Sequence, residues 1–159
     1  MLQRMRFSLI DAIIEQSPDR IVAVKQVSLA EEYLADHFPS FPVLPGVMMI
    51  EAMVQAGRAM LADRTGGNQL VLGEVKALKF GNMVRPGEAL VVEVTLSKQL
   101  EDGSYQCKGA GTVRRSGALS STCPRILRKP AMPAAASVLI GPAEIALTRV
   151  PSGPRLYAR

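Results

Sequence analysis

Apolar residues near the start of the chain recur with the spacing of a β-strand. Ile21, Ala23 and Val27 are separated by two or four positions, which places their side chains on one face of an extended segment. The preceding run, Gln16-Ser17-Pro18-Asp19, is rich in residues that favour turns. The pattern therefore predicts a hairpin between residues 6 and 28 that reverses at residues 16–19.

A second pattern follows a segment that regular structure cannot continue. Residues 29–45 contain several prolines and charged breaks, which predict an ordered loop without a helix or strand. Pro45-Gly46 then opens an apolar stretch, and Gly66 and Gly67 supply a stop after it. We expect a helix over residues 46–63. Because this stretch is apolar on nearly every face, we also expect it to be buried all round.

Four segments rich in β-branched residues follow this helix and are separated by short turns, at residues 69–80, 88–100, 104–115 and 118–128. Strands joined by such short turns are largely antiparallel. One long helix and about six strands predict an α+β fold in which the sheet curls around the helix. We expect this domain to span residues 1–128. Residues 129–159 are rich in Pro, Ala and Arg and predict a loosely docked tail, with room for a short strand near 137–148.

Composition adds limits on location and partners. The chain has 159 residues, enough for one domain. Its uncharged apolar stretches, residues 38–50 and 130–143, are shorter than the roughly 18 residues of a membrane span. We expect a soluble protein without an export signal. Two cysteines, Cys107 and Cys123, are too few for a disulfide scaffold, and their strand positions do not face each other, so we expect free thiols in the cytosol.

The net charge of +5 is unevenly distributed. Residues 108–159 hold nine basic side chains and one acidic side chain. Such a segment attracts an acidic partner, which could be nucleic acid, an anionic membrane surface or an acidic protein. Nucleic-acid binding is poorly supported, since aromatic residues make up only 4% of the chain and no recognition motif is present. A metal cluster is also poorly supported, because zinc and iron sites need three or four convergent ligands and the chain has one histidine and two separated cysteines.

His37 is the single histidine, and it lies in the proline-rich loop just before the predicted helix. Histidine is the side chain best suited to proton transfer near neutral pH. A lone loop histidine is more often structural, so its context has to supply the argument for catalysis.

Glu51 supplies that context because its neighbours in the predicted helix are uncharged and mostly apolar. A carboxylate in such surroundings is costly unless it is partnered or protonated, and a protonated carboxyl can act as a general acid. Gln55 lies one turn further on and could orient the carboxyl group by a hydrogen bond. The alternative is a structural glutamate that reaches water.

The start of the helix is the third candidate. The backbone N–H groups of Gly46 and Val47 have no partner within the helix and lie at the positive end of its dipole. They could polarise a carbonyl oxygen, and Gly46 would let a substrate approach closely. A tight junction between loop and helix explains the glycine equally well.

The string HFPSFPVLPGVMMIEAMVQAG, residues 37–57, resembles the signature of the 3-hydroxyacyl-acyl carrier protein dehydratases of fatty-acid synthesis. His37 and Glu51 stand 14 residues apart, with Pro-Gly in register before the helix. A looser similarity runs from about Phe7 to Arg128 and includes Phe80. The resemblance implies a hot-dog fold and a dimer with sites at the subunit interface.

The resemblance also implies the roles of these residues. His37 would remove the Cα proton, and Glu51 of the partner chain would protonate the departing hydroxyl. The amides of Gly46 and Val47 would hold the thioester oxygen. Phe38, Pro45 and Gln55 would contact the substrate. The implied chemistry needs no cofactor or metal, and the substrate would be carried by an acidic acyl carrier protein, with three dimers as a possible assembly.

Ser40 departs from the family, which usually has glycine after His-Phe-Pro. If this position needs a positive φ, the loop would be strained by about 1 kcal/mol. Two other functions stay open. One is a hot-dog thioesterase or a coenzyme A hydratase, and the other is an acyl-binding module without catalysis.

Overall fold

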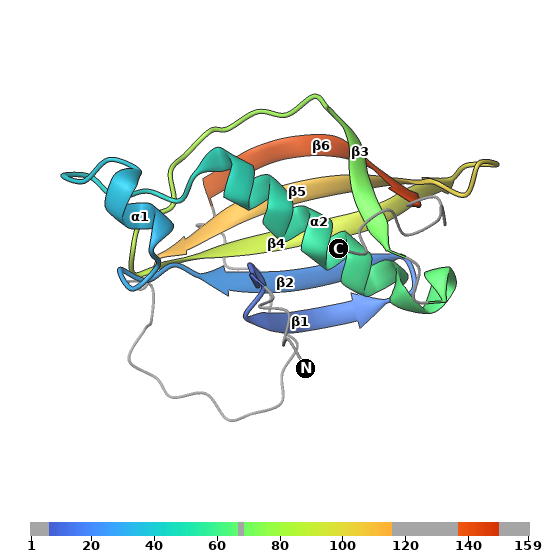
Figure 1. Cartoon of the computed structure of the whole chain (residues 1–159), viewed down its shortest axis with the longest axis horizontal. Helices are drawn as coiled ribbons and strands as arrows, with labels where there is room; N and C mark the ends of the chain where they lie inside the picture. Colours follow the sequence, from blue (N-terminus) through green and yellow to red (C-terminus); the bar gives the residue numbers. More distant parts are fainter. Residues whose placement is uncertain (1–6, 67–68, 116–136, 150–159) are drawn as a thin grey trace, which may run out of the picture.

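The computed structural model describes residues 7–66, 69–115 and 137–149 (Figure 1). One six-stranded sheet and one long helix form most of this part of the chain. In chain order the elements are β1 (Ala12–Ser17), β2 (Arg20–Gln26), α1 (Tyr33–Asp36), α2 (Gly46–Thr65), β3 (Leu70–Lys76), β4 (Glu88–Gln99), β5 (Tyr105–Arg115) and β6 (Ser137–Arg149).

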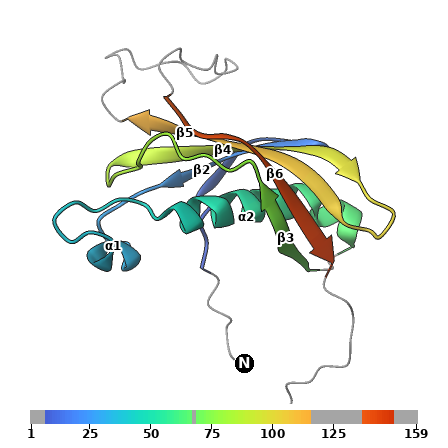
Figure 2. The same ribbon diagram turned by 90° about the horizontal axis from the view of Figure 1, so that it is seen from above.

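The strands lie in the order β1-β2-β4-β5-β6-β3, and every neighbouring pair is antiparallel. The α+β prediction with about six antiparallel strands is therefore confirmed. The sheet curves over α2, which lies across its concave face (Figure 2). In this order β1 and β3 are the two edge strands.

The predicted N-terminal hairpin is confirmed. β1 pairs with β2 around Pro18 and Asp19, with Ser17 opposite Arg20. Ile21 and Ala23 point into the core and are fully buried. The loop prediction for residues 29–45 misses one element, because α1 forms a single helical turn there. This helix has four residues and buries only Leu34, so it is too short to produce a periodic apolar pattern in the sequence.

Helix α2 is the predicted helix, two residues longer than expected, and it ends at Gly66 in the left-handed conformation (φ 58°). Its small residues allow close contact with the sheet. A Cβ on Gly57 would lie 3.0 Å from Leu147 Cδ1, and a Cβ on Gly109 would lie 2.9 Å from Met53 Sδ. Burial all round is wrong for the single chain, since the Val47 side chain is 69% exposed.

β6 corrects the prediction of a tail. Residues 137–149 form a 13-residue strand inside the sheet, paired with β5 on one side and β3 on the other. The expected strand near 137–148 is confirmed, but a loosely docked tail is wrong for these residues, and the domain extends beyond residue 128. Residues 116–136, with the predicted strand at 118–128, and residues 150–159 lie outside the described part of the chain.

Cys107 lies on β5 with a free thiol buried in the core, as expected, whereas Cys123 lies outside the described residues. Burial raises the pKa of the Cys107 thiol to about 11, so it stays protonated and unreactive near neutral pH. No helix in the described ranges is long and apolar enough to cross a membrane.

Replacing Leu147 with alanine tests whether β6 belongs to the core. The side chain is 1% exposed and packs toward α2, so we expect Leu147→Ala to lower the free energy of unfolding by about 2–5 kcal/mol. Urea denaturation measures this change. Leu29→Ala is the control, since Leu29 is 75% exposed and should change stability little. Equal stabilities of the two variants would show that β6 is not part of the core.

Candidate active site

His37 caps the C-terminal end of α1. The turn α1 lies near the N-terminal end of α2 (Figure 1). Its ring Nδ1 is 2.9 Å from the backbone oxygen of Val43. A carbonyl oxygen can only accept a hydrogen bond, so Nδ1 carries the hydrogen in the neutral ring. The lone pair is then on Nε2. The loop therefore holds the half-buried imidazole in the tautomer that a general base needs.

Backbone strain in this loop falls on Phe38. Phe38 has φ 63°, and its carbonyl oxygen accepts a hydrogen bond from Phe41 N at 2.8 Å. Among the described residues only Phe38 and Ala77 combine a side chain with a positive φ, so Ser40 needs no positive φ and the strain considered for it does not arise. A left-handed Phe38 costs about 1–2 kcal/mol. The Phe38 ring, which is mostly exposed, lies 4.4 Å from the His37 ring.

The start of α2 offers the expected free amides. Pro45 is the N-cap, and its carbonyl oxygen accepts hydrogen bonds from Met48 N and Met49 N. The N–H groups of Gly46 and Val47 donate to no acceptor within the described part of the chain. These two groups lie at the positive end of a 20-residue helix. They can polarise a carbonyl oxygen that reaches them.

Phe80 explains why position 46 holds glycine. A Cβ on Gly46 would lie 2.8 Å from Phe80 Cζ, so the half-exposed ring takes the space of a side chain. The sequence left two explanations of Gly46 open, close approach of a substrate and a tight junction between loop and helix. The segment around Phe80 is held in place by the hydrogen bond from Leu44 N to Val84 O at 2.8 Å. This bond joins the segment to residues 29–45, the His37 loop.

Glu51 is less buried than its sequence neighbours suggest, since its side chain is 37% exposed. Its Oε1 accepts hydrogen bonds from Gln55 Nε2 and Arg58 Nη1, both at 3.2 Å. The i, i+4 contact with Gln55 was predicted, but Arg58 was missed although its i, i+7 spacing puts it on the same helix face. An ion pair this exposed contributes only about 0.2–1 kcal/mol, so it orients the carboxyl group more than it stabilises the fold.

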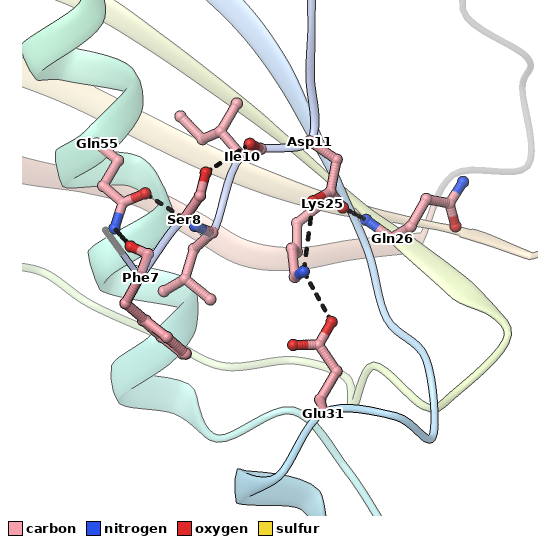
Figure 3. A network of polar contacts seen from close by, with 9 residues as sticks. Phe7, Ser8, Ile10, Asp11, Lys25, Gln26, Glu31 and Gln55 are labelled. Carbon is pink, nitrogen blue, oxygen red and sulfur yellow. Dashed lines mark hydrogen bonds and ion pairs between the residues drawn. The ribbon is translucent and has the colours of Figure 1, made fainter. Parts of the chain in front are cut away.

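Gln55 connects Glu51 to the N-terminal segment, and Figure 3 shows its two contacts with that segment. Its Oε1 accepts a hydrogen bond from Leu9 N at 2.8 Å, and its Nε2 donates to Phe7 O at 3.0 Å as well as to Glu51. These contacts use the amide oxygen and both N–H groups. Gln55 therefore acts on the carboxyl group of Glu51 in this structure, and substrate contact by Gln55 stays a prediction.

Lys25 anchors the base of the His37 loop (Figure 3). Its ammonium group lies 2.7 Å from Glu31 Oε1 and 3.5 Å from Asp11 Oδ1. Asp11 Oδ2 also accepts a hydrogen bond from Gln26 N at 2.6 Å. Because Lys25 is 7% exposed and Glu31 15% exposed, this ion pair is shielded from water. It fixes the chain just before α1 against β2.

Burial, with help from the Glu31 carboxylate, raises the pKa of Tyr33 on α1. The phenol is therefore neutral under ordinary conditions. Its ring meets the Phe7 ring edge to face at 5.8 Å. The N-terminal segment thus contacts both the helix that carries Glu51 and the turn that precedes His37.

Within one chain, His37 and Glu51 belong to separate groups of contacts. No hydrogen bond or ion pair joins them in the described residues. The described ranges also contain no group of three or more His, Cys, Asp or Glu side chains that could hold a metal ion. The arrangement can supply an imidazole oriented through its Nδ1, an oriented carboxyl group and two free amides.

Solved structures place this fold in a known class. The chain superimposes on the dehydratase heterocomplex ApeI:P from Xenorhabdus doucetiae with a TM-score of 0.57 at 13% identity, over 88% of this chain and 96% of that one. It superimposes on a hypothetical thioesterase from Streptococcus pneumoniae, solved with coenzyme A, with a TM-score of 0.56 at 9% identity, over 87% of this chain and 84% of that one. The fold is the hot-dog fold.

Sequence comparison narrows the class to a family. The ApeI-like family, described as ApeI dehydratase, matches residues 13–118. The 3-hydroxyacyl-acyl-carrier-protein dehydratase FabZ of Oenococcus oeni is 40% identical over 116 residues, which cover 71% of this chain and 83% of that protein. The chain therefore belongs to the hot-dog dehydratase family of the ApeI and FabZ type.

Replacing Lys25 with methionine tests the anchor of the His37 loop. Lys25→Met leaves the Glu31 carboxylate shielded from water without its cation, so we expect the free energy of unfolding to fall by about 3 kcal/mol. Lys76→Met is the matched control, because the Lys76–Glu74 pair is exposed on both sides and should matter little. Chemical denaturation compares the two variants. If Lys25→Met is as stable as the control, the ion pair is not an anchor.

Proposed function

We propose that this chain removes water from a 3-hydroxyacyl thioester to form the trans-2-enoyl thioester. The observation that carries the proposal is the dehydratase family match over residues 13–118, a range that includes His37, Gly46 and Glu51. The arrangement of these groups supports it, because within the described part of the chain the His37 ring bonds only through Nδ1, the Gly46 N–H is free and Glu51 is oriented by two donors.

In the proposed reaction, Nε2 of His37 takes the proton from Cα. The hydrogen bond from Nδ1 to Val43 O keeps Nε2 free for this role and stabilises the imidazolium that forms. As the Cα proton leaves, negative charge develops on the thioester oxygen. The free amides of Gly46 and Val47 are suited to hold that oxygen, which is worth several kcal/mol in comparable sites.

Glu51 supplies the proton that the departing hydroxyl needs. The C–O bond at Cβ breaks while the Glu51 carboxyl donates its proton to the departing hydroxyl, which leaves as water. Since no contact links His37 to Glu51 within the described chain, we propose that they meet across a homodimer, each site using His37 of one chain and Glu51 of the other. A particle mass of six chains would indicate three such dimers.

The proposed substrate carrier is an acyl carrier protein, which is the carrier named for the Oenococcus oeni relative. The positive net charge of this chain supports an acidic partner. The free Cys107 thiol supports a reducing compartment, and we propose a cytoplasmic location in fatty-acid or related acyl-chain synthesis.

Incubation with 3-hydroxybutyryl thioesters of both acyl carrier protein and coenzyme A tests this function. We expect enoyl thioester and water to form, with a preference for the protein carrier. His37→Ala and Glu51→Gln should each lower kcat by about a hundredfold or more, because each removes one proton-transfer group. Enoyl absorbance and mass spectrometry of the acyl product measure the reaction.

The same incubation separates the competing functions. Release of free thiol without enoyl product would identify a thioesterase and contradict the proposal. A faster reaction on the coenzyme A thioester would contradict the proposed carrier. If wild-type protein and both variants bind the thioester and return it unchanged, the chain is a non-catalytic acyl-binding protein.

A further inference from the structure

Two anchored donors converge on one oxygen of Glu51 and leave the other oxygen free. Gln55 Nε2 and Arg58 Nη1 both lie 3.2 Å from Oε1. Oε2 accepts no hydrogen bond from the described residues. The two oxygens of this carboxyl group are therefore not equivalent.

Both donors are themselves held from a second side. Arg58 Nε donates to Leu70 O at 2.7 Å, and since the guanidinium is planar, this bond also fixes the direction of Nη1. Leu70 is the first residue of β3 and is buried, so its carbonyl is a rigid anchor. Gln55 is held in the same way by Leu9 N and Phe7 O (Figure 3).

We propose that Arg58 is a positioning residue that determines which oxygen of Glu51 carries the transferred proton. Oε1 faces two N–H donors, so a proton on Oε1 would collide with one of them. The proton of the carboxyl group therefore sits on Oε2. This inference rests on the proposed dehydration, in which Glu51 is the acid.

The same geometry assists the step itself. When Oε2–H gives its proton to the departing hydroxyl, the carboxyl group becomes a carboxylate, and the water takes both the proton and the C–O electron pair. The guanidinium of Arg58 already faces the oxygen that gains negative charge. A charge-assisted hydrogen bond to a carboxylate is stronger than one to a neutral carboxyl, so Arg58 favours the product side of the proton transfer.

Three variants of the full-length chain test the role of Arg58 by kinetics. We expect Arg58→Gln to lower kcat by about tenfold, which is less than the loss of the acid itself, with KM changed less than about twofold. Arg58→Lys keeps a positive charge and should recover part of kcat. Arg64→Gln is the control, because Arg64 lies on the same helix but pairs with Asp19. A rise in KM with kcat unchanged, or an equal fall in kcat in Arg64→Gln, would overturn the proposal.

A spectroscopic measurement does not depend on activity. In protein with 13C-labelled glutamate side chains, we expect the carboxyl signal of Glu51 at neutral pH to shift in Arg58→Gln, shift less in Arg58→Lys and stay in place in Arg64→Gln. An unchanged Glu51 signal in Arg58→Gln overturns the role of Arg58. If the signal shifts but wild-type protein forms no enoyl thioester, the contact stands and the proposed dehydration fails.

Discussion

Close contact between α2 and the curved sheet is the constraint on which the rest of the structure depends. Ala52, Ala56 and Gly57 are buried on the helix. On β5, Gly109 lies so close to the helix that a Cβ there would meet Met53 Sδ. Small residues at such an interface bring the backbones near each other, and interiors packed at this density deform little. The helix therefore has one position on the sheet. That packing therefore fixes where its free N-terminal amides and the Glu51 carboxyl lie on the sheet.

A second set of contacts joins the N-terminal segment and the loop before α2 to this core. The N-terminal segment is joined to α2 by Gln55 and to β2 by Asp11, while Lys25 and Glu31 join β2 to the turn before His37. Each contact is polar and directional, so it orients groups that apolar packing alone would leave free to rotate. The loop that carries His37 owes its geometry to these contacts and to the hydrogen bond with Val43.

The fold could be predicted where periodicity is strong and local. The hairpin, the long helix and the antiparallel strands near 69–80, 88–100 and 104–115 follow from apolar spacing and turn residues, and these are present. The strand near 137–148 was expected, but its place inside the sheet was missed because residues 129–159 read as a Pro-, Ala- and Arg-rich tail, whereas pairing with both β5 and β3 makes β6 a core strand. Pairing between strands distant in sequence overrides weak local preference.

The site was predicted less completely than the fold. His37, Glu51 and Gln55 carry signals in their spacing, but the exposure of Glu51 depends on which helix face the sheet covers, and no local pattern gives that. Arg58 shares the face of Glu51 by simple helical geometry, yet its contact needs Leu70 O as a second anchor. The positive φ at Phe38 instead of Ser40 likewise follows from the turn that closes on Phe41.

The central claim is that His37 of one chain and Glu51 of a second chain form one site, and mixing two inactive variants tests it most directly. His37→Ala and Glu51→Gln protein, unfolded together and refolded, should regain about a quarter of wild-type activity, because half of the dimers are hybrids with one intact site of two. A control mixture of His37→Ala with the double variant has no intact site and should stay inactive. If the first mixture also remains at the level of the separate variants, the two residues do not meet across a dimer.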